Sequence, residues 1–396
     1  MDTIPKIKKT PQQQASMDQQ STQSGAVVGS NDTLLTEILL RLPVTSILRF
    51  KSVSKHWYSL LSHKHFTHRY DTHSKSPGLF ARDKYIPFDA EDPNTPPVDT
   101  LNSYIDSFTS VRVLQSCNGL LLCCTDQWPK IRKSGNKYYV FNPTTKQLSL
   151  IPSVLGGLKA RKTIRFMGLA FHQTDCVHYK VVCIRNVLSY VESYQVQVYS
   201  SDTREWKIST ESFSATKPVF FGQGVYWKGA VYWAPYYENS DHLYFKIDAE
   251  QAEQQLGTLP LPVGLTSSKI MTMYFGESRG HLHLILHMDR GDDSLLLNVY
   301  EMLSDHSGWF VKYQVQLGEL LGAFPEMVSE DRYDFKVIDV VRGEEEGDSF
   351  VVLKTSKRII TYNVHDKSFK LVLSFAGHSY EGSLVFHRYT ETLSLF

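Results

Sequence analysis

The chain has 396 residues with 42 Lys and Arg against 41 Asp and Glu, so its formal net charge is +1. This balance lacks the basic excess that favours nucleic acid or an anionic membrane surface, and no apolar run approaches the roughly 18 to 20 residues that span a bilayer. Five cysteines at irregular spacing are also not typical of a disulfide-stapled secreted domain. We therefore expect an intracellular protein, in the cytoplasm, the nucleus or both, that binds neither membranes nor nucleic acid.

Residues 1–30 are rich in Gln, Ser and Thr and hold few large apolar side chains. Such a segment cannot bury enough surface to offset the entropy lost on ordering, so we predict a disordered tail. We interpret the cluster of Lys6, Lys8 and Lys9 as part of this solvated tail rather than as a nuclear-import signal.

Residues 31–72 have the apolar spacing of three short helices. The first carries an apolar stripe, with Thr33 as its N-cap and an end at Pro43. The second fits residues 46–53, and the third follows an N-cap at Ser54. Three helices in roughly 38 residues form too small a unit to bury all their apolar side chains, so part of this surface is expected to face a partner.

After about residue 77, short β-branched and aromatic runs alternate with turns rich in Gly, Pro, Asn and Asp. No helical period longer than about two turns interrupts this pattern, which argues against a parallel α/β sheet. The sequence therefore predicts a mainly β chain behind the short helical unit.

A degenerate repeat runs through the β region. An aromatic residue, which we call the anchor, is followed by a polar turn and by a bulky residue about seven positions later. The anchors are 46 to 62 residues apart: Phe141, Tyr199, Phe245, Tyr300 and Tyr362. A period near 50 with about four strands is typical of kelch-size propeller blades. Strands left over at 77–82, 107–114 and 383–396 would pair into a composite closing blade, so we predict a kelch-like β-propeller of about six blades.

The stretch from Leu34 to Leu61 resembles the F-box, including the Arg41-Leu42-Pro43 turn and the step from Val53 to Trp57. One departure is that Ser30-Asn31 replaces the Leu-Pro pair that usually opens the motif. The β region resembles the F-box-associated domain of the large plant F-box families. The matching motifs are Ser-Cys-Asn-Gly-Leu-Leu at 116–121, Asn-Pro-Thr-Thr-Lys at 142–146 and the hairpin at 224–233.

This resemblance implies a substrate-recognition subunit of an SCF-type cullin–RING E3 ubiquitin ligase. The F-box at 31–72 would bind a Skp-type adaptor and, through it, the cullin and RING subunits. The β domain at 77–396 would bind an unidentified target protein for ubiquitination. The chain itself would be a non-catalytic subunit without cofactor or metal. The alternative is a propeller that acts as a protein-interaction scaffold outside any ligase.

Two sets of residues are candidates for these contacts. The adaptor set consists of the apolar side chains of the F-box, divided between docking and the unit's own core: Leu34, Leu35, Ile38, Leu39, Leu42, Pro43, Leu48, Val53, Trp57, Leu60 and Leu61. The basic side chains around them would speed encounter with an acidic partner: Arg41, Arg49, Lys51, Lys55, Lys64 and Arg69. The target-binding set is taken from long loops: Trp128, Arg161, Arg165, Tyr236 and Tyr237.

Three other hypotheses compete with this one. A helix-turn-helix is disfavoured because the third helix offers Trp57, Leu60 and Leu61 instead of side chains that contact base edges. His281, His283 and His287 share a strand face and could bind zinc, but a half-exposed strand explains them more simply. Cys123 and Cys124 are better explained as small buried side chains, and the sequence lacks a nucleophile elbow or a phosphate-binding loop.

Overall fold

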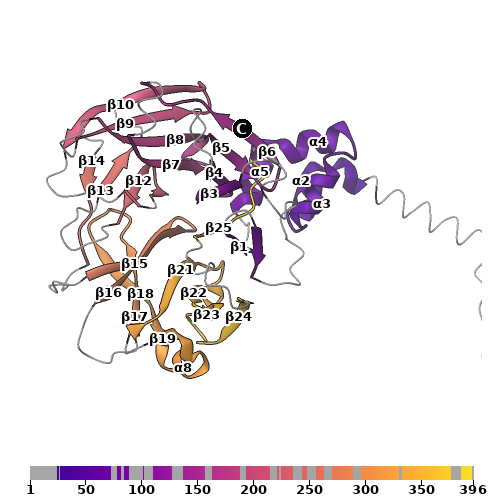
Figure 1. Cartoon of the computed structure of the whole chain (residues 1–396). Coiled ribbons are helices and arrows are strands. Elements are labelled where there is room, and N and C mark those ends of the chain that lie inside the picture. The colour runs from indigo at the N-terminus through magenta and orange to yellow at the C-terminus, as the bar shows by residue number, and fades with distance from the viewer. Residues whose placement is uncertain are drawn as a thin grey trace, which may run out of the picture. The chain divides into compact units, whose positions relative to one another are not determined.

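The computed structural model describes residues 25, 27–72, 78–81, 84–88, 101, 110–126, 137–156, 163–187, 193–214, 221–222, 224–234, 243–247, 256–262, 270–288, 296–329, 332–375 and 385–394. The chain divides into two compact units, Met1–Thr72 and His73–Phe396 (Figure 1). The first is helical and the second is built of antiparallel sheets. In the part of the chain described, no helix combines the length and apolar character needed to cross a bilayer.

Residues 31–72 of the helical unit, all of them described, form four helices where the sequence predicted three. They are α2 (Asp32–Leu39), α3 (Val44–Phe50), α4 (Lys55–Ser62) and α5 (Lys64–Thr72). The fourth was missed because its sequence, Lys-His-Phe-Thr-His-Arg-Tyr-Asp-Thr, is polar apart from two aromatic residues. Residues 27–30, at the end of the predicted tail, are also helical, and residues 1–24 lie outside the described part.

The helix ends correct two predictions and confirm a third. Thr33 is not the N-cap of α2, because the side chain of Asn31 accepts hydrogen bonds from the backbone N–H groups of Thr33 and Leu34, both at 3.1 Å. Pro43 does not end α2 but is the N-cap residue of α3, which suits its fixed φ. Ser54 caps α4 as predicted, accepting from the N–H of Trp57 at 3.1 Å.

The second unit is a six-bladed β-propeller, which confirms the predicted fold class. Each of five blades is a four-stranded antiparallel sheet with its strands in sequence order. The first blade holds β3 (Ser110–Cys117), β4 (Leu120–Asp126), β5 (Tyr138–Asn142) and β6 (Gln147–Ile151). The second holds β7 (Ile164–His172), β8 (Cys176–Asn186), β9 (Ser193–Ser200) and β10 (Glu205–Ser214).

The remaining complete blades follow the same order. The third holds β11 (Val225–Trp227), β12 (Ala230–Trp233), β13 (Leu243–Lys246) and β14 (Leu256–Thr258). The fourth holds β15 (Ile270–Ser278), β16 (His281–Met288), β17 (Leu296–Met302) and β18 (Trp309–Gln316). The fifth holds β21 (Phe335–Val341), β22 (Phe350–Thr355), β23 (Arg358–Asn363) and β24 (Phe369–Ser374). Between the last two lie α8 (Leu317–Ala323), η2 (Pro325–Met327), β19 (Val328–Ser329) and β20 (Arg332–Tyr333), and η3 (Glu346–Asp348) precedes β22.

The predicted repeat corresponds to one structural position. All five anchors lie on the third strand of their blade and are buried: Phe141, Tyr199, Phe245, Tyr300 and Tyr362. In three copies the anchor pairs across the turn with the bulky residue on the fourth strand, as Phe141 does with Leu148. The repeat therefore marks the outer hairpin of each blade.

The closing blade joins the two ends of the propeller. It pairs β25 (Phe386–Tyr389) with β1 (Gly78–Ala81), and β1 with β2 (Lys84–Pro87). The first strands of neighbouring blades contact one another, and β25 contacts β3. The prediction that residues 107–114 belong to the closing blade was wrong, because β3 forms a hairpin with β4 and so opens the first complete blade. Its place is taken by β2, which the sequence did not predict.

Candidate functional site

The eleven adaptor candidates divide by exposure within the helical unit. Leu35, Leu39 and Leu61 are buried and belong to the core. Leu34 is 48% exposed, Ile38 is 49% exposed and Val53 is 59% exposed. The other five are half-buried: Leu42, Pro43, Leu48, Trp57 and Leu60. An even division between core and docking surface was expected, and the side chains occupy both environments.

The helical period explains the division along α2. Leu34 and Ile38 are four residues apart and so lie on one stripe of the helix. Leu35 and Leu39 form the adjacent stripe, which is buried. A single helix thus contributes one apolar stripe to the core and exposes a second, which is the arrangement a docking helix needs.

Contacts among the helices fix the position of this exposed stripe. His56 on α4 lies 2.9 Å from Asp32 at the start of α2, and Arg69 on α5 lies 2.8 Å from Glu37. Each pair is largely exposed and so contributes at most about 1 kcal/mol. The hydroxyl of Tyr70 donates to the carbonyl of Leu42 at 3.3 Å. Together these contacts tie α4 and α5 to α2 and to the turn that follows it.

The basic side chains of the helical unit are unequal in their availability. Arg41, Arg49, Lys55 and Lys64 are exposed, and no ion pair of theirs is found among the described residues. Arg69 is engaged with Glu37. Burial lowers the pKa of Lys51, an effect that the charge of Asp71 opposes. The four exposed cations would accelerate encounter with an acidic partner, most strongly at low salt.

The sequence prediction missed an exposed aromatic residue of the F-box helices. Tyr58 on α4 is 56% exposed. It directly follows Trp57, and neighbouring positions on a helix point about 100° apart, so both rings cannot face the interior. Trp57 instead packs edge-to-face on Phe50, with ring centroids 5.4 Å apart. The adjacent positions of the two aromatic residues in one helix were therefore the sequence feature that could have identified Tyr58 as exposed.

Four of the five target-binding candidates lie outside the described residues: Trp128, Arg161, Tyr236 and Tyr237. The fifth, Arg165, is an exposed residue of β7. It falls at a register shift between Ile164 and Phe166, where β7 has one more residue than its partner β8. Arg165 is thus the extra residue of a β-bulge, a feature that often redirects neighbouring side chains.

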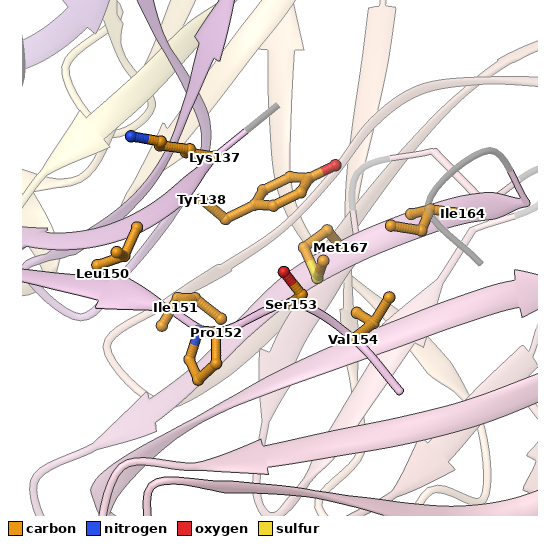
Figure 2. A pocket seen from close by; sticks show the side chains of 9 residues that line it. All are labelled: Lys137, Tyr138, Leu150, Ile151, Pro152, Ser153, Val154, Ile164 and Met167. Atoms are coloured by element: carbon orange, nitrogen blue, oxygen red, sulfur yellow. The ribbon is translucent and has the colours of Figure 1, made fainter. Parts of the chain in front are cut away.

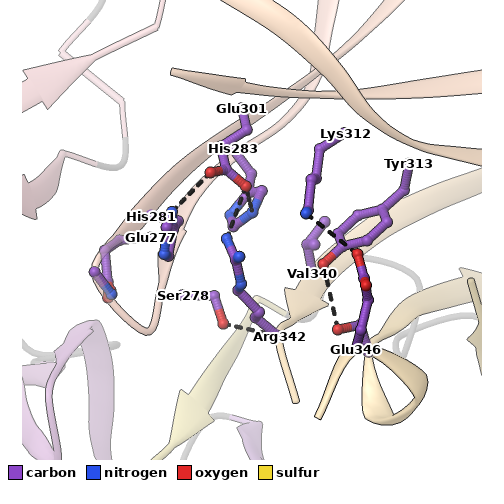
Figure 3. A network of polar contacts seen from close by, with 12 residues as sticks. Glu277, Ser278, His281, His283, Glu301, Lys312, Tyr313, Val340, Arg342 and Glu346 are labelled. Atoms are coloured by element: carbon purple, nitrogen blue, oxygen red, sulfur yellow. Dashed lines mark hydrogen bonds and ion pairs between the residues drawn. The ribbon is translucent and has the colours of Figure 1, made fainter. Parts of the chain in front are cut away.

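Two of the three histidines considered for zinc, His281 and His283, lie in a group of charged side chains between the fourth and fifth blades (Figure 3). His281 lies 2.7 Å from one oxygen of Glu301, and Arg342 donates to the other at 2.8 Å. Burial raises the pKa of Glu301, but the hydrogen bond from His281 and the charge of Arg342 hold this pKa well below its usual value, and His283 lies 3.6 Å from the carboxylate. Across the described residues, no group of three or more His, Cys, Asp or Glu is placed to hold a metal ion.

The other residues considered for a chemical role are buried or lie next to strands. Cys123 and Cys124 are buried on β4, and burial raises the pKa of the Cys123 thiol. Gly224 precedes β11 rather than a helix, so it does not present the helix N-terminus that a phosphate-binding loop requires.

The chain matches two family models, the F-box domain over residues 31–69 and the F-box associated beta propeller domain over residues 68–287. The second match covers more than half of the chain. Together with the helical unit and the six blades, these matches define the class: the chain belongs to the plant-type F-box proteins that carry an F-box-associated β-propeller.

Its relatives include F-box protein At5g07610 of Arabidopsis thaliana, which is 32% identical over 90% of this chain and 88% of its own length. F-box protein At5g49610 of the same plant is 26% identical over 88% of this chain and 92% of its own. Among solved structures, the nidogen/laminin complex aligns with 78% of this chain and 97% of its own, at 10% identity and a TM-score of 0.39. That likeness is too weak to bear on function.

Proposed function

We propose that this chain is the substrate-recognition subunit of an SCF-type cullin–RING ubiquitin ligase. Its F-box, residues 31–72, docks a Skp-type adaptor, and its propeller, within residues 77–396, binds the target protein. The observation that carries the proposal is the exposed stripe of Leu34 and Ile38 on α2 of an F-box, joined by Val53. Exposure of such apolar side chains to water has a free-energy cost, and burial against an apolar partner surface would remove that cost.

In this role the chain performs no bond chemistry. It holds the target near the ubiquitin-loaded enzyme and so raises the effective concentration of target lysines. The work takes place in the cytoplasm, the nucleus or both. Exposed Arg41, Arg49, Lys55 and Lys64 accelerate adaptor capture without adding much to its final affinity.

The test compares two matched double variants of the full chain. Leu34→Ala with Ile38→Ala removes the exposed stripe, whereas Phe369→Ala with Leu371→Ala removes two exposed apolar side chains from β24. Each truncation at a docked interface costs on the order of 1 to 1.5 kcal/mol, so adaptor affinity should fall about 50-fold in the first variant only. Calorimetry with purified Skp-type adaptor measures this. Unchanged affinity in the first variant, or equal losses in both, would contradict the docking surface.

Trp57→Ala with Leu60→Ala is a less specific test of the same surface. Both side chains are half-buried, so truncating them also removes packing inside the helical unit. The residues at 34 and 38 are preferable because their truncation leaves little or no cavity.

The alternative function is a propeller scaffold that acts outside any ligase. The observation that favours it is Ser30-Asn31 in place of the usual Leu-Pro pair, since Asn31 serves as a helix cap instead of an apolar contact. The two functions predict different fates for a protein bound by the propeller. In cells that carry Leu34→Asp with Ile38→Asp, such a protein accumulates if the chain is a ligase receptor and keeps its level if the chain is a scaffold.

A further inference from the structure

A cavity of about 180 Å³ opens between the first and second blades of the propeller (Figure 2). The first blade contributes the apolar side chains of Tyr138, Leu150 and Ile151. Val154 follows β6, and β7 of the second blade adds Ile164 and Met167. Lys137 stands at the end of the cavity near Leu150. Its lining is thus an apolar cup with a cation at one end.

The β-bulge in β7 creates one wall of this cavity. Side chains alternate between the faces of a strand, so residues three positions apart normally point in opposite directions. The register shift between Ile164 and Phe166 changes that alternation. Ile164 and Met167 therefore both line the cavity, and the extra residue, Arg165, is left exposed beside it.

The opposite wall is fixed by hydrogen bonds from the second blade. The indole of Trp206 donates to the carbonyl of Pro152 at 3.0 Å. The side chain of Gln197 accepts from the N–H of Leu155 at 3.0 Å and donates to its carbonyl at 3.3 Å. Arg185 donates to the same carbonyl at 3.0 Å. The segment 152–155 is thus held in place without any ligand, and a pre-formed site avoids the cost of ordering on binding.

Exposed leucines lie on β6, the outer strand of the first blade, and in the segment that follows it. Leu150 is 55% exposed, Leu155 is 42% exposed and Leu148 is 38% exposed. Leu148 and Leu150 share one face of β6, and Leu150 lines the cavity, so these two side chains are candidates for contact with another protein. The central side chain of such a contact would insert into the cavity.

Two described cations stand beside the cavity. Lys137 and Arg165 are exposed. The local field therefore favours an acidic partner.

We propose that this cavity docks an acidic segment of the target protein. One side chain of about the size of Leu, Met or Phe enters the cavity, since an apolar cavity of about 150 Å³ accommodates benzene. Flanking Asp or Glu carboxylates of the target lie near Lys137 and Arg165. The proposal rests on the proposed function as a substrate receptor and names the class of segment that the receptor recognises.

The experiment starts with a library of random twelve-residue peptides, selected on the immobilised full chain and counter-selected on the Ser153→Trp variant, in which an indole at an exposed lining position fills the cavity. The proposal expects enriched peptides that combine several Asp or Glu with one large apolar residue. A synthetic peptide of the enriched sequence then provides affinities by fluorescence anisotropy. Circular dichroism verifies that each variant is folded.

Two changes should each weaken the peptide at least tenfold: replacing its large apolar residue by Ala, and Leu150→Glu in the protein. Lys137→Glu and a rise in salt should weaken it several-fold. The matched controls on β24, Leu371→Glu and Lys370→Glu, should change affinity less than twofold. The proposal is overturned if no peptide is enriched, if the enriched peptides lack an excess of Asp and Glu, or if replacing their large apolar residue leaves the affinity unchanged. It is also overturned if Leu150→Glu and Leu371→Glu have equal effects on affinity. Binding only after phosphorylation of the peptide, or displacement of the peptide by single-stranded nucleic acid, would overturn it as well.

Capture of purified Skp-type adaptor is measured on the same preparations. Adaptor capture without peptide selection overturns the acidic-segment site and leaves the receptor function standing. Peptide binding without adaptor capture overturns the ligase assignment and leaves the site standing.

Discussion

The helical unit and the propeller treat large apolar side chains differently. In the helical unit Leu34, Ile38, Val53 and Tyr58 are all about half exposed or more. In the propeller the largest side chains are fully buried, including Trp233, Tyr179 and Tyr232. A unit of some forty residues has too much surface for its volume, whereas stacked blades bury one another's faces. The difference supports the proposal that the helical unit completes its burial on a partner.

The two regions also differ in how far apart their stabilising contacts lie in the sequence. The helices depend on local caps such as Asn31 and Ser54. The propeller depends on contacts between its ends: Asn142 donates to the carbonyls of Thr392 and Ser394 at 3.2 and 3.0 Å. Local contacts survive when a distant one is lost, so a variant in one region should leave the other unchanged.

The largest effect is expected from Arg388 on the closing strand β25. Its Nε donates to Asp339 of β21 at 2.7 Å, and its Nη1 donates to Ser278 of β15 at 2.7 Å. Arg388→Met leaves the largely buried carboxylate of Asp339 without its cation, which should destabilise the propeller by about 3 to 5 kcal/mol. Urea unfolding measures this loss, and adaptor affinity should stay unchanged.

The control for Arg388 is the double variant Arg388→Met with Asp339→Leu, which removes both charges. It should recover much of the lost stability because Asp339 no longer leaves a buried carboxylate without its cation. A double variant no more stable than the single one would show that packing, rather than charge pairing, closes the ring.

Two glycines in equivalent hairpins provide the next prediction. Gly119 and Gly229 have φ of +92° and +79° and follow the first strand of their blades. A Cβ at Gly119 would lie 2.4 Å from the side chain of Thr392 in the C-terminal segment, whereas one at Gly229 would meet nothing within 4 Å. Gly119→Ala should therefore cost about 2 to 4 kcal/mol and Gly229→Ala about 1 kcal/mol. Equal shifts in the urea midpoints of the two variants would show that the close approach of Gly119 to Thr392 does not contribute to the stability of the propeller.

Acid should destabilise the propeller through His387. Burial lowers the pKa of this side chain to about 4, against a hydrogen bond with the backbone of Val113 that raises it. The unfolded chain has the ordinary value of about 6.5, so it binds a proton that the folded chain excludes, and stability falls as the pH drops from 6.5 to 4. Between pH 7 and 4.5 the loss should be about 2.5 kcal/mol.

The control is His387→Gln, which cannot titrate. Urea unfolding of this variant should be less sensitive to pH by that amount. If variant and parent lose stability in parallel, the acid sensitivity comes from other groups.

The smallest effect is expected in the helical unit. Asn31→Ala removes the side chain that caps α2 and should cost about 1 kcal/mol locally. Hydrogen exchange should increase in residues 32–39 and stay constant in the propeller strands. Asn31→Asp, which preserves the accepting oxygen, should behave like the parent. Faster exchange in the propeller as well would show that the two regions do not unfold independently.

The sequence alone was a good guide wherever a local pattern carries the information. It predicted the cap at Ser54, the apolar stripe of α2 and the outer hairpin of each blade, because these depend on residues a few positions apart. It missed α5, whose polar residues hide the spacing of Phe66 and Tyr70. It also placed residues 107–114 in the wrong blade, because pairing partners far apart in sequence leave no local trace.

The sequence by itself determined the class of this protein, its two regions and the apolar character of its F-box. Only the tertiary structure decided which F-box side chains stay exposed, that Glu301 lies beside His281 and His283, and that residues around a bulge line a cavity between two blades. The physical reason is that helical and strand periods are set by neighbouring residues, whereas burial, charge pairing and cavities depend on which distant segments pack together.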